Sequence, residues 1–336
     1  MTASVRVAVV GAAGYAGGEL VRLLAGHPLV EIASVHARGR AGTPVAAELP
    51  HLAPLELVFR EDDPDDVQVA FLALPHGASA PLASRLLDRG VTVVDIGADF
   101  RLRDPDAYAT WYGAPHPCPE LLGDAVYGLT EWSRDALRGA KLIANPGCYP
   151  TASLLALVPF ARAGLLDGDP IIDAKSGISG AGRGAGADYL FTELTESTRA
   201  YGLEGHRHRP EIEQGLADAG APLSVTFIPH LVPQSRGILA TCYLSLARDL
   251  DDDAIANLLH LAYDGEPFVH VSDAPPATKQ TTGSNHAFVH GRRVGERRAV
   301  VVSVIDNLGK GAAGQAIQNM NVALGLDEAA GIGALG

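Results

Sequence analysis

A glycine-rich turn between an apolar segment and a helical one constrains the fold most strongly. Residues 5–10 are apolar after Arg6 and rich in valine, as in a strand buried on both faces. The turn 11–17 follows, and residues 18–25 repeat apolar side chains at helical spacing. Small residues there let a pyrophosphate approach the N–H groups of a helix N-terminus. The segment therefore predicts a dinucleotide site formed by Gly11, Ala13, Gly14, Tyr15, Ala16 and Gly17. The alternative is a tight turn that binds nothing.

The N-terminal part continues to alternate strand-like segments with helical ones. Strand-like segments at 31–36, 67–74, 91–96 and 141–144 accompany helical spacing at 80–88. This alternation indicates an α/β fold with a Rossmann-type, doubly wound parallel sheet. We predict that this dinucleotide-binding domain spans residues 1–148 and is completed by a C-terminal helix at 310–330.

The pattern changes after about residue 150. Strand-like runs occur at 170–175, 224–228, 237–247 and 299–305, with helical segments at 153–163 and 251–264. This pattern predicts a second, α+β domain with a mixed sheet at residues 149–309.

Composition excludes several classes of protein. The chain has 336 residues and a net charge of −13, which argues against a nucleic-acid partner. Three scattered cysteines do not make a disulfide scaffold or a zinc ribbon. No apolar run approaches the about 20 residues of a membrane helix, and the N-terminus lacks a signal pattern. We therefore expect a cytoplasmic protein without a membrane partner.

The end of the second predicted strand bears on the choice of dinucleotide. The segment Ser34-Val-His-Ala-Arg38-Gly-Arg40 contains no acidic residue. A ribose 2′-hydroxyl is usually read by Asp or Glu, whereas a 2′-phosphate suits Arg and hydroxyl groups. We therefore predict NADP as the cofactor, contacted by Ser34 and Arg38. The alternative is that the arginines are only solvated surface residues.

Cys148 is the candidate nucleophile. It follows Pro146-Gly147 and precedes Pro150, so we place it on a tight turn just ahead of a helix N-terminus. Such a position lowers the pKa of a thiol, and the thiolate attacks carbonyl carbon. The competing interpretation is a buried structural cysteine. Cys242, on an apolar strand face, fits that description better, and Cys118 lies in a proline-flanked loop.

The segment Gly205–Glu211 concentrates ionisable side chains. A thiolate enzyme needs a base near its nucleophile, and two histidines spaced like these are a weak metal signal, so we predict no metal. We expect a helix containing Glu211–Leu216 that begins after the cluster, because Pro210 disfavours helix at Arg209. We favour His208 as base, oriented by Glu211, and His206 as a substrate or structural contact. A solvated basic loop is the alternative.

Two further segments suit anions. Arg101 lies just past the Asp95–Asp99 strand end and is our candidate anchor for a substrate phosphate; a structural ion pair is the alternative. The Gly/Ser loop 176–182 can offer backbone N–H groups to an anion.

With these segments identified, the chain resembles the N-acetyl-gamma-glutamyl-phosphate reductase family, which is similar to aspartate-semialdehyde dehydrogenase. The resemblance runs nearly end to end, through residues 11–17, 74–77, 95–102, 145–149, 176–182, 205–211, 229–233 and 306–311. It implies reduction of an acyl phosphate by NADPH in the arginine pathway, with Cys148 as nucleophile forming a thioester and a histidine of the cluster as base. One departure is Gly97, where we expect Ser.

The resemblance also implies contacts beyond those argued above. The additional cofactor contacts are Pro75, His76, Gly77, Ser176, Gly177, Gly180 and Asn307. The substrate contacts are Arg101, Asn145, Ser179, His206 and Arg207. We further expect a small-molecule substrate and a homodimer or homotetramer.

Two other functions remain open at this point. One is a reductase for aminoadipyl phosphate held on a carrier protein, in lysine biosynthesis; the segment 179–186 with Arg183 is where its specificity should differ. The other is a non-catalytic NADP-binding sensor, although such a protein should have lost the thiol or the histidine cluster.

Overall fold

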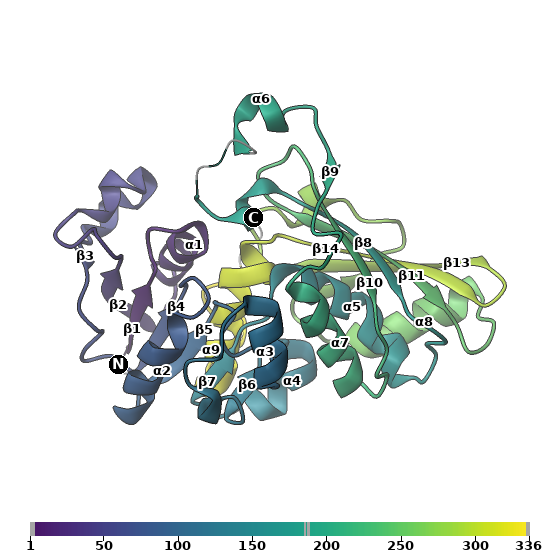
Figure 1. Ribbon diagram of the computed structural model, residues 1–336, viewed down its shortest axis with the longest axis horizontal. Coiled ribbons are helices and arrows are strands. Elements are labelled where there is room, and N and C mark those ends of the chain that lie inside the picture. The colour runs from purple at the N-terminus through teal and green to yellow at the C-terminus, as the bar shows by residue number, and fades with distance from the viewer. Residues whose placement is uncertain (1–3, 185, 187–188, 334–336) are drawn as a thin grey trace. The chain divides into compact units, whose positions relative to one another are not determined.

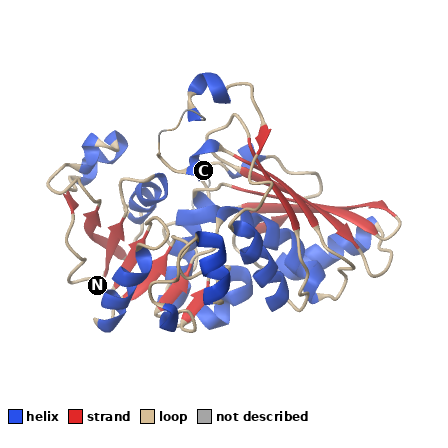
Figure 2. Ribbon diagram, in the orientation of Figure 1, coloured by secondary structure: helices blue, strands red, loops and turns tan. Residues whose placement is uncertain are grey.

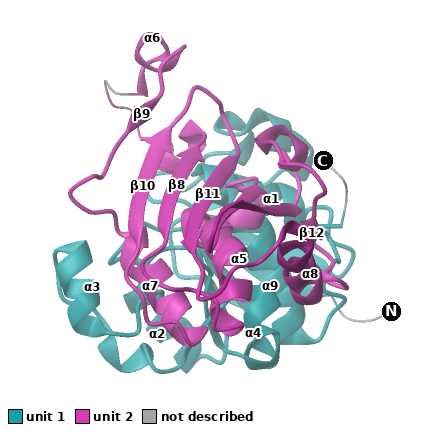
Figure 3. Cartoon of the chain, turned by 90° about the vertical axis from the view of Figure 1, so that its right-hand side faces the viewer, with its two compact units in different colours: residues 1–146, 312–334 teal, residues 147–311, 335–336 magenta. Residues whose placement is uncertain are grey.

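The computed structural model describes residues 4–184, 186 and 189–333, and the chain divides into two compact units (Figure 3). Unit 1 contains Met1–Pro146 and Ala312–Ala334, and unit 2 contains Gly147–Gly311 with Leu335–Gly336. The chain passes from unit 1 to unit 2 directly before Cys148 and returns within the π-helical segment Gly309–Ala313.

Unit 1 is built on a parallel sheet with strand order β3-β2-β1-β4-β5-β7-β6. The strands are β1 (Val5–Val10), β2 (Val30–His36), β3 (Phe59–Arg60), β4 (Val69–Leu72), β5 (Thr92–Asp95), β6 (Ala125–Tyr127) and β7 (Leu142–Ala144). The order reverses between β1 and β4, which makes the sheet doubly wound. The predicted Rossmann-type sheet is confirmed.

Helices cover both faces of this sheet (Figure 1). They are α1 (Tyr15–Leu24), α2 (Ser79–Asp88), α3 (Pro105–Tyr112), α4 (Thr130–Leu137) and α9 (Gly314–Leu324). α1 and α4 both contact α9, which carries the C-terminal part of the chain back onto this sheet, whereas α2 contacts β5.

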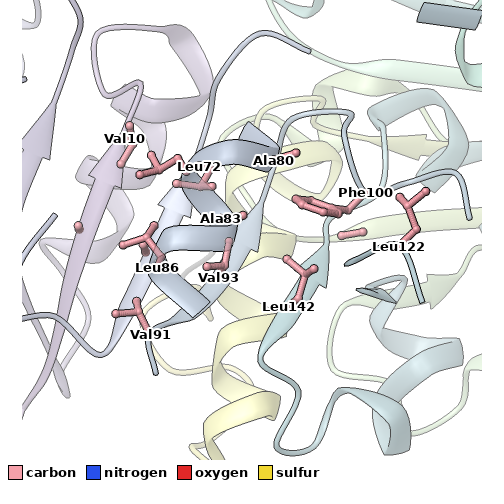
Figure 4. Close-up of a cluster of buried hydrophobic side chains, with 14 residues drawn as sticks. Val10, Leu72, Ala80, Ala83, Leu86, Val91, Val93, Phe100, Leu122 and Leu142 are labelled. Atoms are coloured by element: carbon pink, nitrogen blue, oxygen red, sulfur yellow. The ribbon is translucent and has the colours of Figure 1, made fainter. Parts of the chain in front are cut away.

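Figure 4 shows one side of the unit 1 core. Ala80, Ala83 and Leu86 of α2 recur every three residues, so they share the face that packs against Leu72 and Val93. All five are fully buried. Burial of each large aliphatic side chain contributes about 1.5–3 kcal/mol, so this spacing fixes α2 on the sheet.

Unit 2 contains a mixed sheet with strand order β12-β13-β14-β11-β8-β10-β9. Figure 2 draws the strands of both sheets in red. The strands are β8 (Ile171–Ser176), β9 (Arg199–Ala200), β10 (Thr226–Leu231), β11 (Ile238–Ser245), β12 (Val269–Val271), β13 (Ala287–Gly295) and β14 (Arg298–Ile305). β8 pairs parallel with β10, whereas β11 pairs antiparallel with β8 and β14. The predicted α+β domain with a mixed sheet is therefore confirmed.

The helices of unit 2 are α5 (Cys148–Arg162), α6 (Phe191–Leu194), α7 (His208–Asp218) and α8 (Asp252–Tyr263). α5 packs on β11 and β14 and contacts α7, and α8 packs on β13. Gly291 of β13 permits this close packing, because a Cβ there would lie 2.6 Å from Ile255 of α8. Within the part of the chain that is described, no helix is long and apolar enough to cross a membrane.

Three helices begin earlier than the sequence patterns predict. α1 starts at Tyr15, α5 at Cys148 itself, and α7 at His208. The prediction that Pro210 keeps Arg209 out of the helix is wrong. Pro210 is the third residue of α7, and the first-turn N–H groups of a helix have no intrahelical partner, so the missing N–H of a proline costs little there.

Candidate active-site residues

The glycine turn of unit 1 has backbone geometry that only small residues permit. Gly11 has a φ of 88°, and a Cβ on it would lie 2.2 Å from the Ala73 oxygen. A Cβ on Gly17 would lie 2.2 Å from the Gly11 oxygen. α1 then starts with Gly14 as N-cap, without a side-chain cap or an acidic residue in its first turn. Its N-terminal N–H groups therefore suit an anionic ligand, and the residues fit the predicted pyrophosphate site.

β2 ends beside this turn. The His36 oxygen accepts hydrogen bonds from Gly11 N (2.9 Å) and Ala12 N (3.0 Å). The Ser34 hydroxyl is buried and hydrogen-bonded to His36 Nε2 at 2.8 Å. Arg38 is exposed and makes no hydrogen bond or ion pair with the described residues. Of the two predicted cofactor contacts here, Arg38 is thus available to a ligand, whereas Ser34 already has a partner.

Asp99 organises the turn that contains Pro75, His76 and Gly77. Its carboxylate accepts hydrogen bonds from Gly77 N (2.6 Å), Ser79 N (3.0 Å) and Ala80 N (2.9 Å), and from the Tyr108 hydroxyl (3.0 Å). The carboxylate therefore caps α2 and holds an exposed turn at the carboxyl edge of the sheet, where ligands of such folds bind.

Asp95, at the end of β5, is fully buried, and its Oδ1 accepts a hydrogen bond from Gly97 N at 3.0 Å. Burial raises the pKa of Asp95 to about 7, and the Asp99 carboxylate acts in the same direction. A Cβ on Gly97 would lie 2.8 Å from Asp95 Oδ1 and 2.9 Å from Ser79 Oγ. The expected Ser therefore has no room at position 97, because the Ser79 hydroxyl occupies the neighbouring space.

Arg101 and Asn145 hold the strand ends together. Arg101 is only 9% exposed and donates through Nε to the Asn145 oxygen (3.0 Å) and through Nη2 to the Ile96 oxygen (2.8 Å). The fully buried Asn145 amide donates to the Ala312 oxygen (3.2 Å) and accepts from Asn319 (3.1 Å). These bonds favour a positioning role for Asn145 over the predicted substrate contact.

Cys148 is the first residue of α5 and is half-buried. Gly147 is the N-cap, and its N–H donates to Glu211 Oε1 at 2.7 Å. The first turn of α5 contains no acidic residue, so the helix N-terminus favours the thiolate form. A Cβ on Gly311 would lie 2.9 Å from the Cys148 Cβ. Glu211 thus holds the residue before the cysteine, and the missing side chain of Gly311 leaves room for the cysteine Cβ.

The other two cysteines are less suited to nucleophilic chemistry. Cys242 is fully buried in β11, and burial raises its pKa to about 12. Burial also raises the pKa of Cys118. Because the thiolate is the reactive form, Cys148 remains the candidate nucleophile.

His206 and His208 stand next to each other at the start of α7, with ring centroids 4.8 Å apart. His206 Nδ1 accepts a hydrogen bond from His208 N at 3.1 Å. The Tyr149 ring contacts both imidazoles edge-on, at 5.8 Å and 5.9 Å. The cluster is therefore gathered around the residue that follows Cys148, while Arg207 is exposed.

Residues of the predicted Gly/Ser loop lie close to the Asn307 side chain. Asn307 Nδ2 donates to Ser179 Oγ at 2.9 Å, and Asn307 Oδ1 accepts from Gly237 N at 2.7 Å. A Cβ on Gly180 would lie 3.1 Å from Ser176 Oγ. Gly177 N donates to the Gly237 oxygen at 2.8 Å. Four predicted cofactor contacts and Ser179 thus lie together in unit 2.

Among the described residues, no three His, Cys, Asp or Glu side chains are grouped to hold a metal ion.

Comparisons with known proteins define the class of protein. The family model "Semialdehyde dehydrogenase, NAD binding domain" matches residues 6–140, and the model "Semialdehyde dehydrogenase, dimerisation domain" matches residues 148–307. Aspartate semialdehyde dehydrogenase II from Vibrio cholerae has the same fold, with a TM-score of 0.71, 16% identity, and coverage of 96% of this chain and 98% of that chain. The enzyme from Candida albicans, solved with NADP, gives a TM-score of 0.71 at 17% identity over 95% of this chain and 98% of that chain.

Relatives of higher sequence identity show which family within this class the chain belongs to. The N-acetyl-gamma-glutamyl-phosphate reductases of Halorhodospira halophila and Dehalococcoides mccartyi are 50% and 46% identical to the chain, over 98% of it and 98% of each relative. That of Symbiobacterium thermophilum is 49% identical over 98% of the chain and 97% of the relative. The chain belongs to the N-acetyl-gamma-glutamyl-phosphate reductase family, and unit 1 contains its nicotinamide-dinucleotide-binding domain.

Sequence reasoning missed several residues around Cys148. A side chain on Gly311 would meet the Cys148 Cβ, and the Tyr201 hydroxyl donates to the Tyr149 hydroxyl at 3.2 Å. Phe227 packs against Tyr149 at 5.3 Å. These residues lie far from Cys148 in sequence. Gly311 belongs to the segment 306–311 that carries the resemblance, but no role was predicted for it, and Tyr201 and Phe227 have no local pattern of their own.

Proposed function

We propose that the chain reduces N-acetyl-gamma-glutamyl phosphate to N-acetylglutamate semialdehyde with NADPH, through a thioester on Cys148, in arginine biosynthesis. The observation that supports this most directly is the placement of Cys148 at the N-terminus of α5, where Glu211 holds the preceding residue and Gly311 leaves room for the cysteine Cβ. The names of relatives at 46–50% identity point to the same substrate.

The first half-reaction forms the thioester. The Cys148 thiolate attacks the acyl carbon, a C–S bond forms, and the bond from that carbon to the phosphate oxygen breaks, so inorganic phosphate leaves. Splitting the reduction into two steps lowers each barrier. Arg101 is our proposed anchor for the departing phosphate, because a guanidinium binds phosphate through two parallel hydrogen bonds.

The second half-reaction reduces the thioester. When bound, the nicotinamide cofactor supplies the hydride. The resulting thiohemiacetal on Cys148 collapses when its hydroxyl loses a proton, so the C–S bond breaks, the aldehyde leaves and the thiolate is restored. We assign the proton transfers to His208, which lies at the start of α7 against the Tyr149 ring. Glu211 supports Cys148 through Gly147, and its orientation of His208 stays a prediction.

We propose NADP rather than NAD. The exposed Arg38 follows β2 without an ion-pair partner among the described residues, which suits a 2′-phosphate. The other proposed cofactor contacts are Gly11, Ala13, Gly14, Tyr15, Ala16, Gly17, Ser34, Pro75, His76, Gly77, Ser176, Gly177, Gly180 and Asn307. The small size of the glycines and alanines among them, and the backbone N–H groups of these residues, support this assignment.

We assign cofactor binding to residues 1–148 with 310–330, and substrate binding, catalysis and oligomerisation to residues 149–309. The family model for residues 148–307 is described as a dimerisation domain, which favours a homodimer or a homotetramer. Size-exclusion chromatography with light scattering tests this, and a monomer at micromolar concentration contradicts it.

A phosphate-dependent assay of the reverse reaction tests the function. The protein should reduce NADP with N-acetylglutamate semialdehyde and phosphate, and the aminoadipate counterpart should react far more slowly. A reversed preference would favour the carrier-linked aminoadipyl reductase, whose specificity segment 179–186 includes Ala185, which lies outside the described residues. Binding of NADP without turnover of either aldehyde would favour the sensor.

The covalent step has its own test. Cys148→Ser should abolish turnover and leave NADPH binding intact, with Cys118→Ser as the matched control. Mass spectrometry after mixing the wild-type protein with acyl phosphate should find the acyl group on Cys148. An adduct on Cys118 or Cys242, or no adduct, would remove the thioester mechanism.

A further inference from the structure

The His206 imidazole has a fixed tautomer. Its Nδ1 accepts a hydrogen bond from the backbone N–H of His208 at 3.1 Å. A ring nitrogen that accepts a hydrogen bond carries no proton, so the single proton of the neutral ring is on Nε2. Protonation of Nδ1 would break the bond that holds the ring at the start of α7.

The surroundings of His206 oppose a positive charge. The rings of Tyr149, Tyr201 and Phe227 contact it edge-on at centroid distances of 5.8, 5.6 and 5.4 Å. Burial lowers the pKa of His206 to about 4, and the adjacent Arg207 acts in the same direction.

The other titratable groups that face His206 do not restore that charge. His208 is the second imidazole, at 4.8 Å. Burial raises the pKa of Tyr201 to about 12 and also raises that of Tyr149, so both tyrosines stay neutral near neutral pH. His206 is therefore neutral across the physiological range.

The Nε2–H group of His206 is available to a ligand, since it makes no hydrogen bond with the described residues. Two of the rings that pack on His206 also lie near the reactive cysteine. Tyr149 follows Cys148 in α5, and the Cys148 charge contributes to the raised pKa of both Tyr149 and Tyr201. The two tyrosines that pack on His206 are thus within electrostatic range of the thiolate.

We propose that His206 is a neutral hydrogen-bond donor, and not a proton acceptor, which binds through Nε2–H the carbonyl oxygen of the acyl group carried by Cys148. This inference rests on the proposed function. That oxygen gains negative charge when the thiolate attacks and again when hydride adds. A donor fixed in place before the reaction stabilises the charge without reorganising. The proton stays on Nε2 throughout, so the base is a different group.

Substitution by glutamine and leucine separates a donor from a base. The glutamine side chain can place an N–H donor near the position of Nε2, but it does not accept a proton at neutral pH. His206→Gln should keep kcat within about tenfold of the wild type with the same pH profile, whereas His206→Leu should lose about 100-fold or more in kcat with a smaller change in KM. His208→Gln is the matched control: its pH–rate profile should lack the limb that reports titration of the base. Equal losses in the two His206 variants, or a lost limb in His206→Gln, would overturn the donor role.

A spectroscopic measurement tests the tautomer without substrate. In ¹⁵N-histidine NMR of the full chain, the His206 signals, assigned by their absence in His206→Gln, should show the neutral Nε2–H form from pH 5.5 to 8.5. Titration of His206 near pH 6.5, or a proton on Nδ1, would overturn the inference even in an active enzyme. Failure of the wild-type protein to turn over either aldehyde would instead overturn the proposed function, while leaving the tautomer result intact.

Discussion

Replacing the buried Asp95 by asparagine should stabilise unit 1, and the gain should grow with pH. The carboxyl group is fully buried at the end of β5, and burial raises its pKa from 3.8 to about 7. Asparagine has nearly the same shape and can still accept the hydrogen bond from Gly97 N. It does not ionise, so the folded protein no longer holds a buried charge at high pH.

The expected magnitude follows from the shift in pKa. Because the folded state binds this proton more tightly than the unfolded state, the free energy of unfolding falls as pH rises from about 4 to about 7, and is flat above. The shift of about 3 units corresponds to roughly 4 kcal/mol at pH 8. At pH 5 the buried Asp95 lowers the free energy of unfolding by only about 1.5 kcal/mol. Asp95→Asn should therefore gain about 3 kcal/mol more at pH 8 than at pH 5.

Tryptophan fluorescence in urea measures this effect. Both tryptophans of the chain, Trp111 and Trp132, belong to unit 1, so their emission reports its unfolding. The exposed Asp135 provides the control, since Asp135→Asn should change stability equally at both pH values. An equal effect of Asp95→Asn at pH 5 and pH 8 would refute the argument that Asp95 is held protonated by burial.

Other substitutions test the proposed site. Arg38→Ala should raise KM for NADPH roughly ten- to a hundred-fold and leave KM for NADH unchanged; equal losses with both would make Arg38 structural. Gly311→Ala should lower kcat about ten- to a hundred-fold, because its Cβ displaces Cys148, whereas Gly123→Ala, with open space around it, should not. Arg101→Lys should raise KM for phosphate in the reverse reaction. If the variant only lowers the free energy of unfolding and leaves the phosphate dependence unchanged, Arg101 has a structural role through its hydrogen bonds to the Asn145 and Ile96 oxygens. His208→Asn should lower kcat at least about 100-fold and remove the limb of the pH–rate profile near pH 6–7. If that limb persists, another residue is the base.

The sequence by itself determined the two types of sheet and the glycine turns that precede α1 and α5, although both helices begin earlier than the patterns predict. The apolar run 5–10 followed by Gly11–Gly17 is local: Gly11 has a positive φ, and a Cβ on Gly17 would lie 2.2 Å from the Gly11 oxygen. The turn at Gly147 likewise sets Cys148 at the start of α5 through chain neighbours alone. Local patterns were less reliable at α7: a proline disfavours helical backbone at the residue before it, yet Arg209, which precedes Pro210, lies in this helix.

Only the tertiary structure decided how the cysteine is surrounded. Gly311 lies 163 positions beyond Cys148, and Glu211, which binds Gly147, lies 64 residues away from it. Residues of α5, α7 and β10 meet around His206, and burial at the end of β5 raises the pKa of Asp95. Hydrophobic periodicity predicts which face of a helix or strand is buried, but it does not specify which distant residue packs against that face. Contacts, burial and the resulting pKa shifts are set by that packing, so they depend on the folded chain as a whole.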